Sequence, residues 1–309
     1  MTRSTCSGSC SWQILLLEAV QLFLTMREVV NMDGATDQLA ETTVANGEKV
    51  RSGNEEQSKV LEVRKQLGKL SGKTALYCTD SCISRYLAAR NWNVNKASKM
   101  LTETLKWRDE YKPHEIRWDD ISHEAETGKV YRANFWDKRG RPVLVMRPRC
   151  QNTKSTKGQI KYLVYCMENA IRNLGRGQEM VWLIDFKGFS LTHLSLKQTK
   201  EAAHVLQNHY PERLGLAVLY DPPKFFEPFW KAAKLFLEPK TFSKVKFVYA
   251  DEPNSLKMME ELFDFNELES AFGGNDAAAF DLSKYAARMK EDDKVEMDSF
   301  AAQITIADS

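Results

Sequence analysis

Three short, unbroken apolar segments constrain the fold of this chain more than any other feature. They are Val143–Met146, Val181–Ile184 and Leu216–Leu219. Continuous apolar runs of this length are typical of strands buried on both faces, as in a parallel sheet. In a fourth segment, 245–249, Lys246 interrupts the apolar residues, which indicates a more exposed strand.

Helical patterns separate these strands. Apolar residues recur at helical spacing from Ile160 to Leu174, before Gly175, and again from Leu196 to Leu206. Two further helical patterns cover 224–237 and Pro253–Phe263. Because strands and helices alternate along the chain, the sequence predicts an α/β fold with a mainly parallel sheet.

A small helical module is predicted ahead of the sheet. Thr79–Asp80 can cap one helix, and a second runs from Asn95 to Tyr111, with apolar residues on one face. Pro113 stops the second helix. We therefore expect an all-helical subdomain at about 58–115.

The two ends of the chain are expected to be loose. Residues 31–57 are polar and cannot bury enough apolar surface to form a core, so we interpret them as a linker. The segment after Gly274 is acidic and alanine-rich, with at most a short helix. The apolar run Ile14–Leu24 is shorter than the roughly 20 residues that a membrane span needs, and we interpret it as an amphipathic helix or an unstructured extension of a soluble protein.

Charge and cysteine content exclude two classes of function. The 44 basic and 42 acidic residues leave a net charge of +2, so no global field favours nucleic acid. Of the six cysteines, the pairs Cys6/Cys10 and Cys78/Cys82 have no histidine nearby, so a zinc site is not predicted. We interpret the thiols as small buried groups in a reducing compartment.

No motif for catalysis or a cofactor is complete. Ser71–Thr74 resembles the end of a phosphate-binding loop, but Leu67 stands where that loop needs glycine. Gly188–Thr192 lacks the final glycine of a nucleophile elbow. Asp185, at the end of an apolar strand, is interpreted as a turn cap in preference to a catalytic carboxylate. His204 and His209 are badly spaced for a metal site; His204 is expected to be solvated and His209 to be packed.

A basic run and an aromatic cluster remain. The basic run is the segment from Lys138 to Met167, which contains no acidic residue. It forms either a solvated face or a contact with an anionic surface. Its eight basic residues are Lys138, Arg139, Arg141, Arg147, Arg149, Lys154, Lys157 and Lys161. The cluster is Phe225, Phe226, Phe229 and Trp230, which spread around a helix that begins with three prolines. This spread indicates unusual burial or contact with an apolar partner, and is compatible with a mobile lid.

Taken in order, several segments resemble the CRAL-TRIO lipid-binding family, and most closely its phosphatidylinositol-transfer branch. The resemblance covers about 75–274. The segments are Ile83–Val94 with Lys96-Ala97 and Lys106-Trp107-Arg108, Gly140–Val143, Ile184–Gly188, Asn208–Gly215, Phe236–Thr241 with Lys244, and Phe272–Gly274.

The resemblance implies a deep apolar pocket that is floored by the sheet and closed by a movable helix at about 223–237. The aromatic cluster would then face acyl chains on one side and a bilayer on the other. The expected organisation is a flexible extension at 1–57, a helical N-terminal module at 58–115, a lipid-binding domain at 116–274 and an acidic flexible tail at 275–309.

The resemblance also implies the ligand-binding residues. The inositol phosphate headgroup positions fall on Arg90, Glu212, Thr241 and Lys244, and a further basic position of the family is Asn91 here. The basic residues would pair with phosphate, and the glutamate would accept from inositol hydroxyls. The family's phosphatidylcholine positions fall on Ala133, Leu144, Met180 and Trp182, none of which has a hydroxyl.

We therefore expect a non-enzymatic protein without a cofactor, cytoplasmic and peripherally associated with membranes. It would bind phosphatidylinositol, contact anionic membrane surfaces transiently and exchange or present the lipid there. A second hydrophobic ligand is compatible with the apolar phosphatidylcholine positions. Two alternatives stay open: a carrier of a sterol, tocopherol-like or retinoid-like molecule, and a lipid-gated regulatory scaffold for a protein partner.

Overall fold

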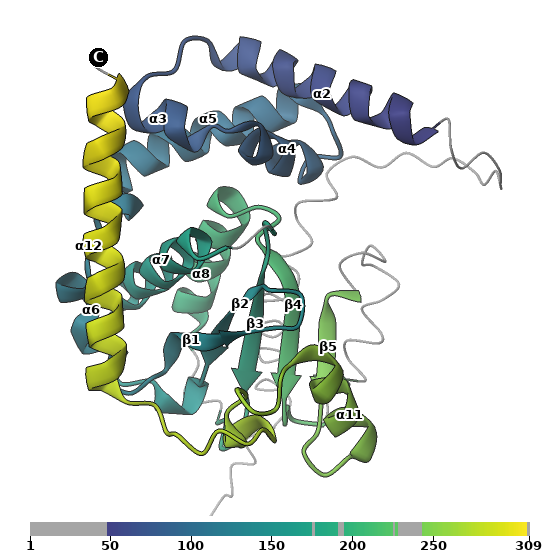
Figure 1. Cartoon of the computed structure of the whole chain (residues 1–309), viewed down its shortest axis with the longest axis vertical. Helices are drawn as coiled ribbons and strands as arrows, with labels where there is room; N and C mark the ends of the chain where they lie inside the picture. The colour runs from purple at the N-terminus through teal and green to yellow at the C-terminus, as the bar shows by residue number, and fades with distance from the viewer. Residues whose placement is uncertain (1–47, 175–176, 191–194, 225, 228–242, 308–309) are drawn as a thin grey trace, which may run out of the picture. The chain divides into compact units, whose positions relative to one another are not determined.

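A computed structural model describes residues 48–174, 177–190, 195–224, 226–227 and 243–307. These residues form two compact units. The helical unit comprises 48–112, 206–212 and 295–307, and the sheet unit comprises the described parts of 113–205 and 213–294. Figure 1 shows their elements.

The helical unit begins with four helices: α2 (Glu48–Leu67), α3 (Gly72–Tyr77), α4 (Asp80–Ala88) and α5 (Val94–Tyr111). The predicted cap of α4 is confirmed, because Thr79 Oγ1 accepts a hydrogen bond of 3.2 Å from the amide of Cys82. Asn93 caps α5 in the same way, at 3.0 Å from the amide of Lys96. The helix ends at Tyr111, and the next residue, Lys112, caps it with a left-handed backbone of φ 54° before Pro113.

One face of each of three helices forms the core of this unit. Its fully buried side chains come from α2, α4 and α5, and include Val63, Ile83, Tyr86, Leu87, Ala97 and Leu101. The start of α2 corrects the expected extension at 1–57, because residues 48–57 are helical. These polar residues extend the turns that carry Val60 and Val63, and Glu55 pairs with Lys59 one turn later at 2.7 Å.

The sheet unit is built on five strands in the order of the chain. They are β1 (Val130–Trp136), β2 (Pro142–Met146), β3 (Met180–Asp185), β4 (Leu214–Tyr220) and β5 (Val245–Val248). β1 pairs with β2 antiparallel, and every other pair is parallel. The predicted mainly parallel α/β sheet is therefore confirmed, and all six residues of β3 are buried.

Strand β1 was not predicted. Its sequence carries Arg132 and Asn134, which interrupt the apolar pattern. Arg132 is nevertheless buried, because its guanidinium donates to Asn169 Oδ1 and to Asp292 Oδ2, each at 2.6 Å. A strand that buries a charge by long-range pairing leaves no apolar run in the sequence.

Helices and short turns surround the sheet. The helices are α6 (Trp118–Ala125), α7 (Thr156–Arg172), α8 (Leu196–His209), α11 (Pro253–Leu262) and α12 (Leu282–Ala307), and the 3₁₀ turns are Pro113–Glu115, Pro148–Cys150 and Ser270–Phe272. α7 packs against β1 and β2, and α11 packs against β5. The predicted helix at 224–237 lies largely outside the described residues.

Helix α12 differs from the loose tail expected at 275–309. It runs from Leu282 to Ala307 and is drawn in yellow in Figure 1. Tyr285, Met289 and Asp293 recur every four residues on one face and are buried. The carboxylate of Asp293 accepts a 2.7 Å hydrogen bond from the amide of Trp118, at the start of α6. Charged residues separate these buried ones, so the composition of the segment does not indicate a helix with a buried face.

Candidate functional site

Arg90 lies in an unusual turn after α4. The next two residues, Asn91 and Trp92, have left-handed backbones with φ 49° and 58°, which is rare for residues other than glycine. The amide of Trp92 donates to the carbonyl of Leu87 at 2.7 Å and closes the turn. Arg90 is half-buried; burial lowers the pKa of its guanidinium, and Glu103 opposes this shift. The turn therefore holds a partly desolvated cation.

Glu212 lies in the turn between α8 and β4. Its backbone is also left-handed, with φ 54°, although it has a full side chain. Such a conformation costs about 1 kcal/mol and persists only where the surroundings enforce it. The side chain is partly exposed, between the buried residues Pro211 and Arg213.

A cluster within the helical unit fixes the residues just before Glu212. We call it the His209 clamp, and it consists of Tyr86, Thr104, Trp107 and His209. Thr104 Oγ1 lies 3.2 Å from His209 Nδ1, and Tyr86 OH donates to the carbonyl of His209 at 3.3 Å. The Trp107 ring stacks on the His209 ring, with centroids 4.1 Å apart. The clamp thus joins the segment that carries Glu212 to α4, the helix that leads into Arg90.

Lys244 precedes β5 in the sheet unit and already has partners there. Its Nζ donates to the carbonyl of Leu214 at 2.8 Å and lies 3.6 Å from Glu179 Oε1. A side chain at Gly215 would collide with Glu179, since an added Cβ would lie 2.5 Å from its Oε2. Sequence reasoning missed Glu179, because 65 residues separate it from Lys244 and no short motif contains both.

The remaining predicted site residues are mostly outside the described part of the chain. These are Thr241, Phe225, Phe229 and Trp230. Phe226 is described and only 6% exposed. Its ring contacts Phe186 and Phe189 edge-on, with centroids 5.4 Å and 6.3 Å away. Of the two interpretations offered for this cluster, Phe226 therefore fits burial.

The positions equivalent to the phosphatidylcholine site lie in the sheet. Ala133, Leu144, Met180 and Trp182 are all buried, in β1, β2 and β3. Leu144 and Trp182 are direct partners in the parallel register. No hydroxyl group lies at these four positions, as the sequence indicated.

Half of the predicted basic run is engaged in ion pairs. Arg141 pairs with Asp137 at 2.7 Å, Arg147 with Glu269 at 2.5 Å, Arg149 with Asp185 at 2.6 Å and Lys161 with Asp120 at 3.1 Å. Arg139, Lys154 and Lys157 remain exposed. The run is therefore not one continuous basic surface, and only part of it is available to an anionic partner.

Asp185 has the structural role that the sequence favoured. Its Oδ1 accepts a 2.9 Å hydrogen bond from the amide of Lys187, which caps the turn after β3. Its Oδ2 pairs with Arg149 and lies 3.5 Å from Arg147 Nε. Across the described residues, no group of three or more histidine, cysteine, aspartate or glutamate side chains could hold a metal ion.

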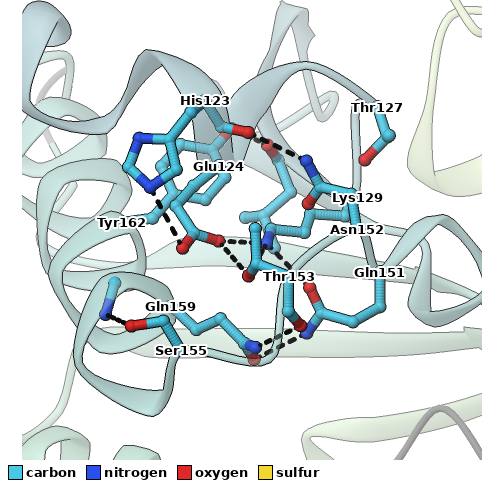
Figure 2. Close-up of polar contacts among 12 residues, drawn as sticks. His123, Glu124, Thr127, Lys129, Gln151, Asn152, Thr153, Ser155, Gln159 and Tyr162 are labelled. Carbon is cyan, nitrogen blue, oxygen red and sulfur yellow. Dashed lines mark hydrogen bonds and ion pairs between the residues drawn. The ribbon is translucent and has the colours of Figure 1, made fainter.

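A second buried polar cluster, which was not predicted, lies at the start of α7 (Figure 2). Lys129 pairs with Glu124 and donates to Gln151 Oε1 at 2.7 Å. Thr153 donates to Glu124 Oε2 at 2.7 Å, and Gln159 donates to the carbonyl of Thr153 at 2.8 Å. Burial lowers the pKa of Lys129, and Glu124 opposes the shift. The cluster ties α6 and α7 to the residue before β1, although Glu124 Oε1 is buried without a hydrogen-bond partner among the described residues and lies 3.4 Å from His123 Nε2.

Two segments of the sequence match models of one known family. Residues 54–103 match the CRAL/TRIO N-terminal domain and residues 125–274 match the CRAL/TRIO domain. The chain therefore belongs to the CRAL/TRIO family. Among the described residues, no helix is both long and apolar enough to cross a membrane.

Particular relatives differ in length from this chain. A CRAL-TRIO domain-containing protein of Schizosaccharomyces pombe is 36% identical over 218 residues, which are 70% of this chain and 21% of that protein. Phosphatidylinositol transfer protein PDR17 of Saccharomyces cerevisiae is 33% identical over 219 residues, with 66% of this chain and 60% of that protein covered. Phosphatidylinositol transfer protein CSR1 of Eremothecium gossypii is 28% identical over 217 residues, with 65% and 48% covered. The chain thus spans between a fifth and three fifths of these relatives.

A solved structure also shares the fold. The crystal structure of Sfh5 has a TM-score of 0.54 with this chain at 16% sequence identity. The likeness covers 85% of this chain and 100% of Sfh5. At this level of identity it shows the fold alone.

Proposed function

We propose that the protein binds phosphatidylinositol, holds its acyl chains in an apolar site and exchanges or presents it at membrane surfaces without covalent chemistry. One observation carries the proposal. Glu212 keeps a strained left-handed backbone beside the His209 clamp, which attaches it to the helix that leads into Arg90. Backbone strain that the surroundings enforce is typical of functional positions. The names of the relatives PDR17 and CSR1 agree with this function.

The headgroup would be bound by complementary charge. Arg90 and Lys244 would pair with the phosphate, and Glu212 and Thr241 would hydrogen-bond inositol hydroxyls. Lys244 would have to share its ammonium group with Glu179, at 3.6 Å. A phosphate that approaches Lys244 therefore meets a carboxylate, which favours a ligand that also offers hydroxyl donors to that carboxylate.

Membrane contact is the second part of the proposal. The aromatic residues Phe225, Phe229 and Trp230 would gate the apolar site, with Phe226 anchoring the segment. The exposed cations Arg139, Lys154 and Lys157 would contact anionic lipids at a cytoplasmic surface.

A second hydrophobic ligand is the alternative that one observation favours. Leu144, Met180 and Trp182 present large buried apolar groups where a phosphatidylcholine headgroup would need hydroxyls. A sterol-like molecule or another weakly polar lipid suits these side chains better. Mass spectrometry of lipids extracted from the purified protein distinguishes the two ligands.

Transfer of phosphatidylinositol between vesicles tests the main proposal. The variant Arg90→Ala with Lys244→Ala should slow transfer about 100-fold or more, because it removes two charged hydrogen bonds. The matched control is Lys69→Ala with Lys257→Ala, which removes one exposed cation from each unit and leaves the proposed membrane-contact residues unchanged. Equal transfer by the wild type and the Arg90/Lys244 variant would refute the headgroup site.

A further inference from the structure

Trp182, the third residue of β3, carries a hydrogen-bond donor that the described residues leave unused. The side chain is 7% exposed, and its Nε1 atom is buried without a hydrogen-bond partner. An indole N–H can only donate. Buried donors of this kind are almost always satisfied in native proteins, so one that is not requires an explanation.

The sheet around Trp182 offers no strong acceptor side chain. Leu144 on β2 and Ala217 on β4 pair directly with Trp182, which places all three side chains on one face. Met180 and Ile184 lie on the same face, two residues before and after Trp182 in β3. These neighbours are at most 4% exposed, and the only heteroatom among their side chains is the thioether sulfur of Met180, which is a weak acceptor. A strong acceptor for the indole must therefore come from outside the strands.

The nearest polar group on this face in the strand register is a guanidinium, which has donors only and so cannot accept a hydrogen bond from the indole. Arg132 on β1 lies opposite Leu144, and two strand spacings of about 4.8 Å separate its strand from β3. Its guanidinium engages Asn169 Oδ1 and Asp292 Oδ2. The polar cluster of Arg147, Asp185 and Glu269 cannot supply an acceptor for the indole. Asp185 follows Ile184 directly in β3, so its side chain lies on the opposite face of the sheet.

We propose that the Trp182 indole donates a hydrogen bond to an oxygen of the bound lipid and so acts as a specificity-determining residue. This inference rests on the proposed function. A single neutral donor among apolar side chains suits one neutral acceptor, since a buried phosphate would need several donors or a cation. The ligand class is therefore an amphiphile with an ester carbonyl or a hydroxyl within its apolar body.

Paired lipids that differ in one acceptor test the inference. Lipid-free protein is incubated with vesicles that contain diacyl phosphatidylinositol or its dialkyl ether analogue, which lacks the carbonyls. A parallel pair contains a 3-hydroxysterol or its 3-deoxy analogue. The wild type should load the acceptor-bearing member of one pair about five- to tenfold more, as one buried hydrogen bond predicts. Trp182→Phe, which keeps an aromatic ring but lacks the N–H, should load both members equally.

Controls separate this inference from folding and from the function on which it rests. Trp136→Phe, at a 43% exposed position on β1, should discriminate as the wild type does. The indole ¹H–¹⁵N resonance of Trp182 in the wild type should shift and gain exchange protection with the preferred lipid only. This measurement stands even if Trp182→Phe does not fold.

The outcomes are distinct. Preference within the phosphatidylinositol pair assigns the acceptor to a carbonyl, and preference within the sterol pair assigns it to a hydroxyl. Loading of phosphatidylinositol without preference in either pair overturns the inference and leaves the proposed function intact. Failure of the wild type to load phosphatidylinositol from either vesicle overturns the proposed function, and the inference with it.

Discussion

The ring of Trp107 lies flat on the ring of His209, with 4.1 Å between their centroids and 6° between their planes. Trp107 belongs to α5, and His209 is the last residue of α8. Thr104, one turn before Trp107, also donates to the carbonyl of Asn208 at 2.8 Å. The residues just before Glu212 are therefore fixed by aromatic stacking and by side-chain hydrogen bonds.

The first prediction concerns this stack. Trp107→Ala should lower the free energy of unfolding by about 2–3 kcal/mol, because it removes a large packed ring and its aromatic pair. It should also increase amide exchange across 206–212 and slow phosphatidylinositol transfer, because the turn at Glu212 loses its support. Denaturant titration, hydrogen exchange and the vesicle assay measure the three effects.

Trp136→Ala is the matched control for Trp107→Ala. Trp136 is 43% exposed, so its loss should change stability by less and leave exchange at 206–212 unchanged. If Trp107→Ala destabilised the protein but transferred lipid at the wild-type rate, the clamp would have no role in positioning Glu212.

The second prediction separates strain from binding at Glu212. Glu212→Gly should leave the free energy of unfolding unchanged or raise it by up to about 1 kcal/mol, because glycine adopts a left-handed backbone without steric cost. The same change removes the carboxylate, so transfer should fall. The unfolding temperature would then stay the same or rise, while the rate of transfer in the vesicle assay would fall.

Lys112→Gly is a close control, since Lys112 has the same φ of 54° but caps the end of α5. It should stabilise the protein as Glu212→Gly does and leave transfer unaffected. A Glu212→Gly variant that transfers phosphatidylinositol normally would remove Glu212 from the headgroup site.

The centre of the sheet could be predicted because its strands are buried on both faces. β3 consists of six buried residues in succession, and the apolar run Val181–Ile184 reports this directly. β1 could not be predicted, because the burial of Arg132 depends on Asn169 and Asp292, which are 37 and 160 residues away. Local periodicity contains no information about partners at that distance.

The candidate site was likewise predictable from the sequence only in part. The motifs around Trp107 and His209 were both visible, and packing of His209 was expected. Their contact was not, since more than a hundred residues separate them; the neighbouring Thr104–His209 pair spans 105 positions. The partnership of Lys244 with Glu179 was hidden for the same reason. The residue types at a site can be read from motifs, whereas the groups that orient or compete with them come from the fold.

The third prediction concerns the ion pair that attaches α12 to β1. Asp292→Ala should lower the free energy of unfolding by about 3 kcal/mol, because it leaves the buried guanidinium of Arg132 without its carboxylate. Adding Arg132→Met should recover part of this loss, since the uncompensated charge is then removed. A double-mutant cycle by denaturant titration measures the coupling.

An exposed ion pair that joins α12 to α6 provides the comparison. Asp119 lies 3.6 Å from Lys290, and both side chains are largely exposed. Asp119→Ala should therefore change stability by less than about 1 kcal/mol. Equal losses of stability from Asp119→Ala and Asp292→Ala would show that the burial of Arg132 does not determine how much its ion pair with Asp292 contributes.

The last prediction is a pH dependence to which two buried thiols contribute, together with buried tyrosines whose pKa values burial also raises. Burial raises the pKa of Cys78 and of Cys166 from 9.0 to about 12. The fold thus favours the neutral thiols, so their contribution to stability is complete below pH 9 and is lost as the pH rises from 9 through 12. The free energy of unfolding should decrease across this interval, and less so in Cys166→Ala after correction for its lost packing.

Alkylation followed by peptide mass spectrometry checks the same thiols in the native protein. At pH 8 the thiolate that reacts with iodoacetamide is scarce at Cys78 and Cys166, and both side chains are buried. Cys150, which is partly exposed, should therefore be labelled first among these three, and the other two only at the rate of unfolding. In denaturant all three should react alike. If Cys166 were labelled in the native protein as fast as Cys150, solvent would have to reach this thiol in α7. Burial would then not be what keeps the thiol neutral.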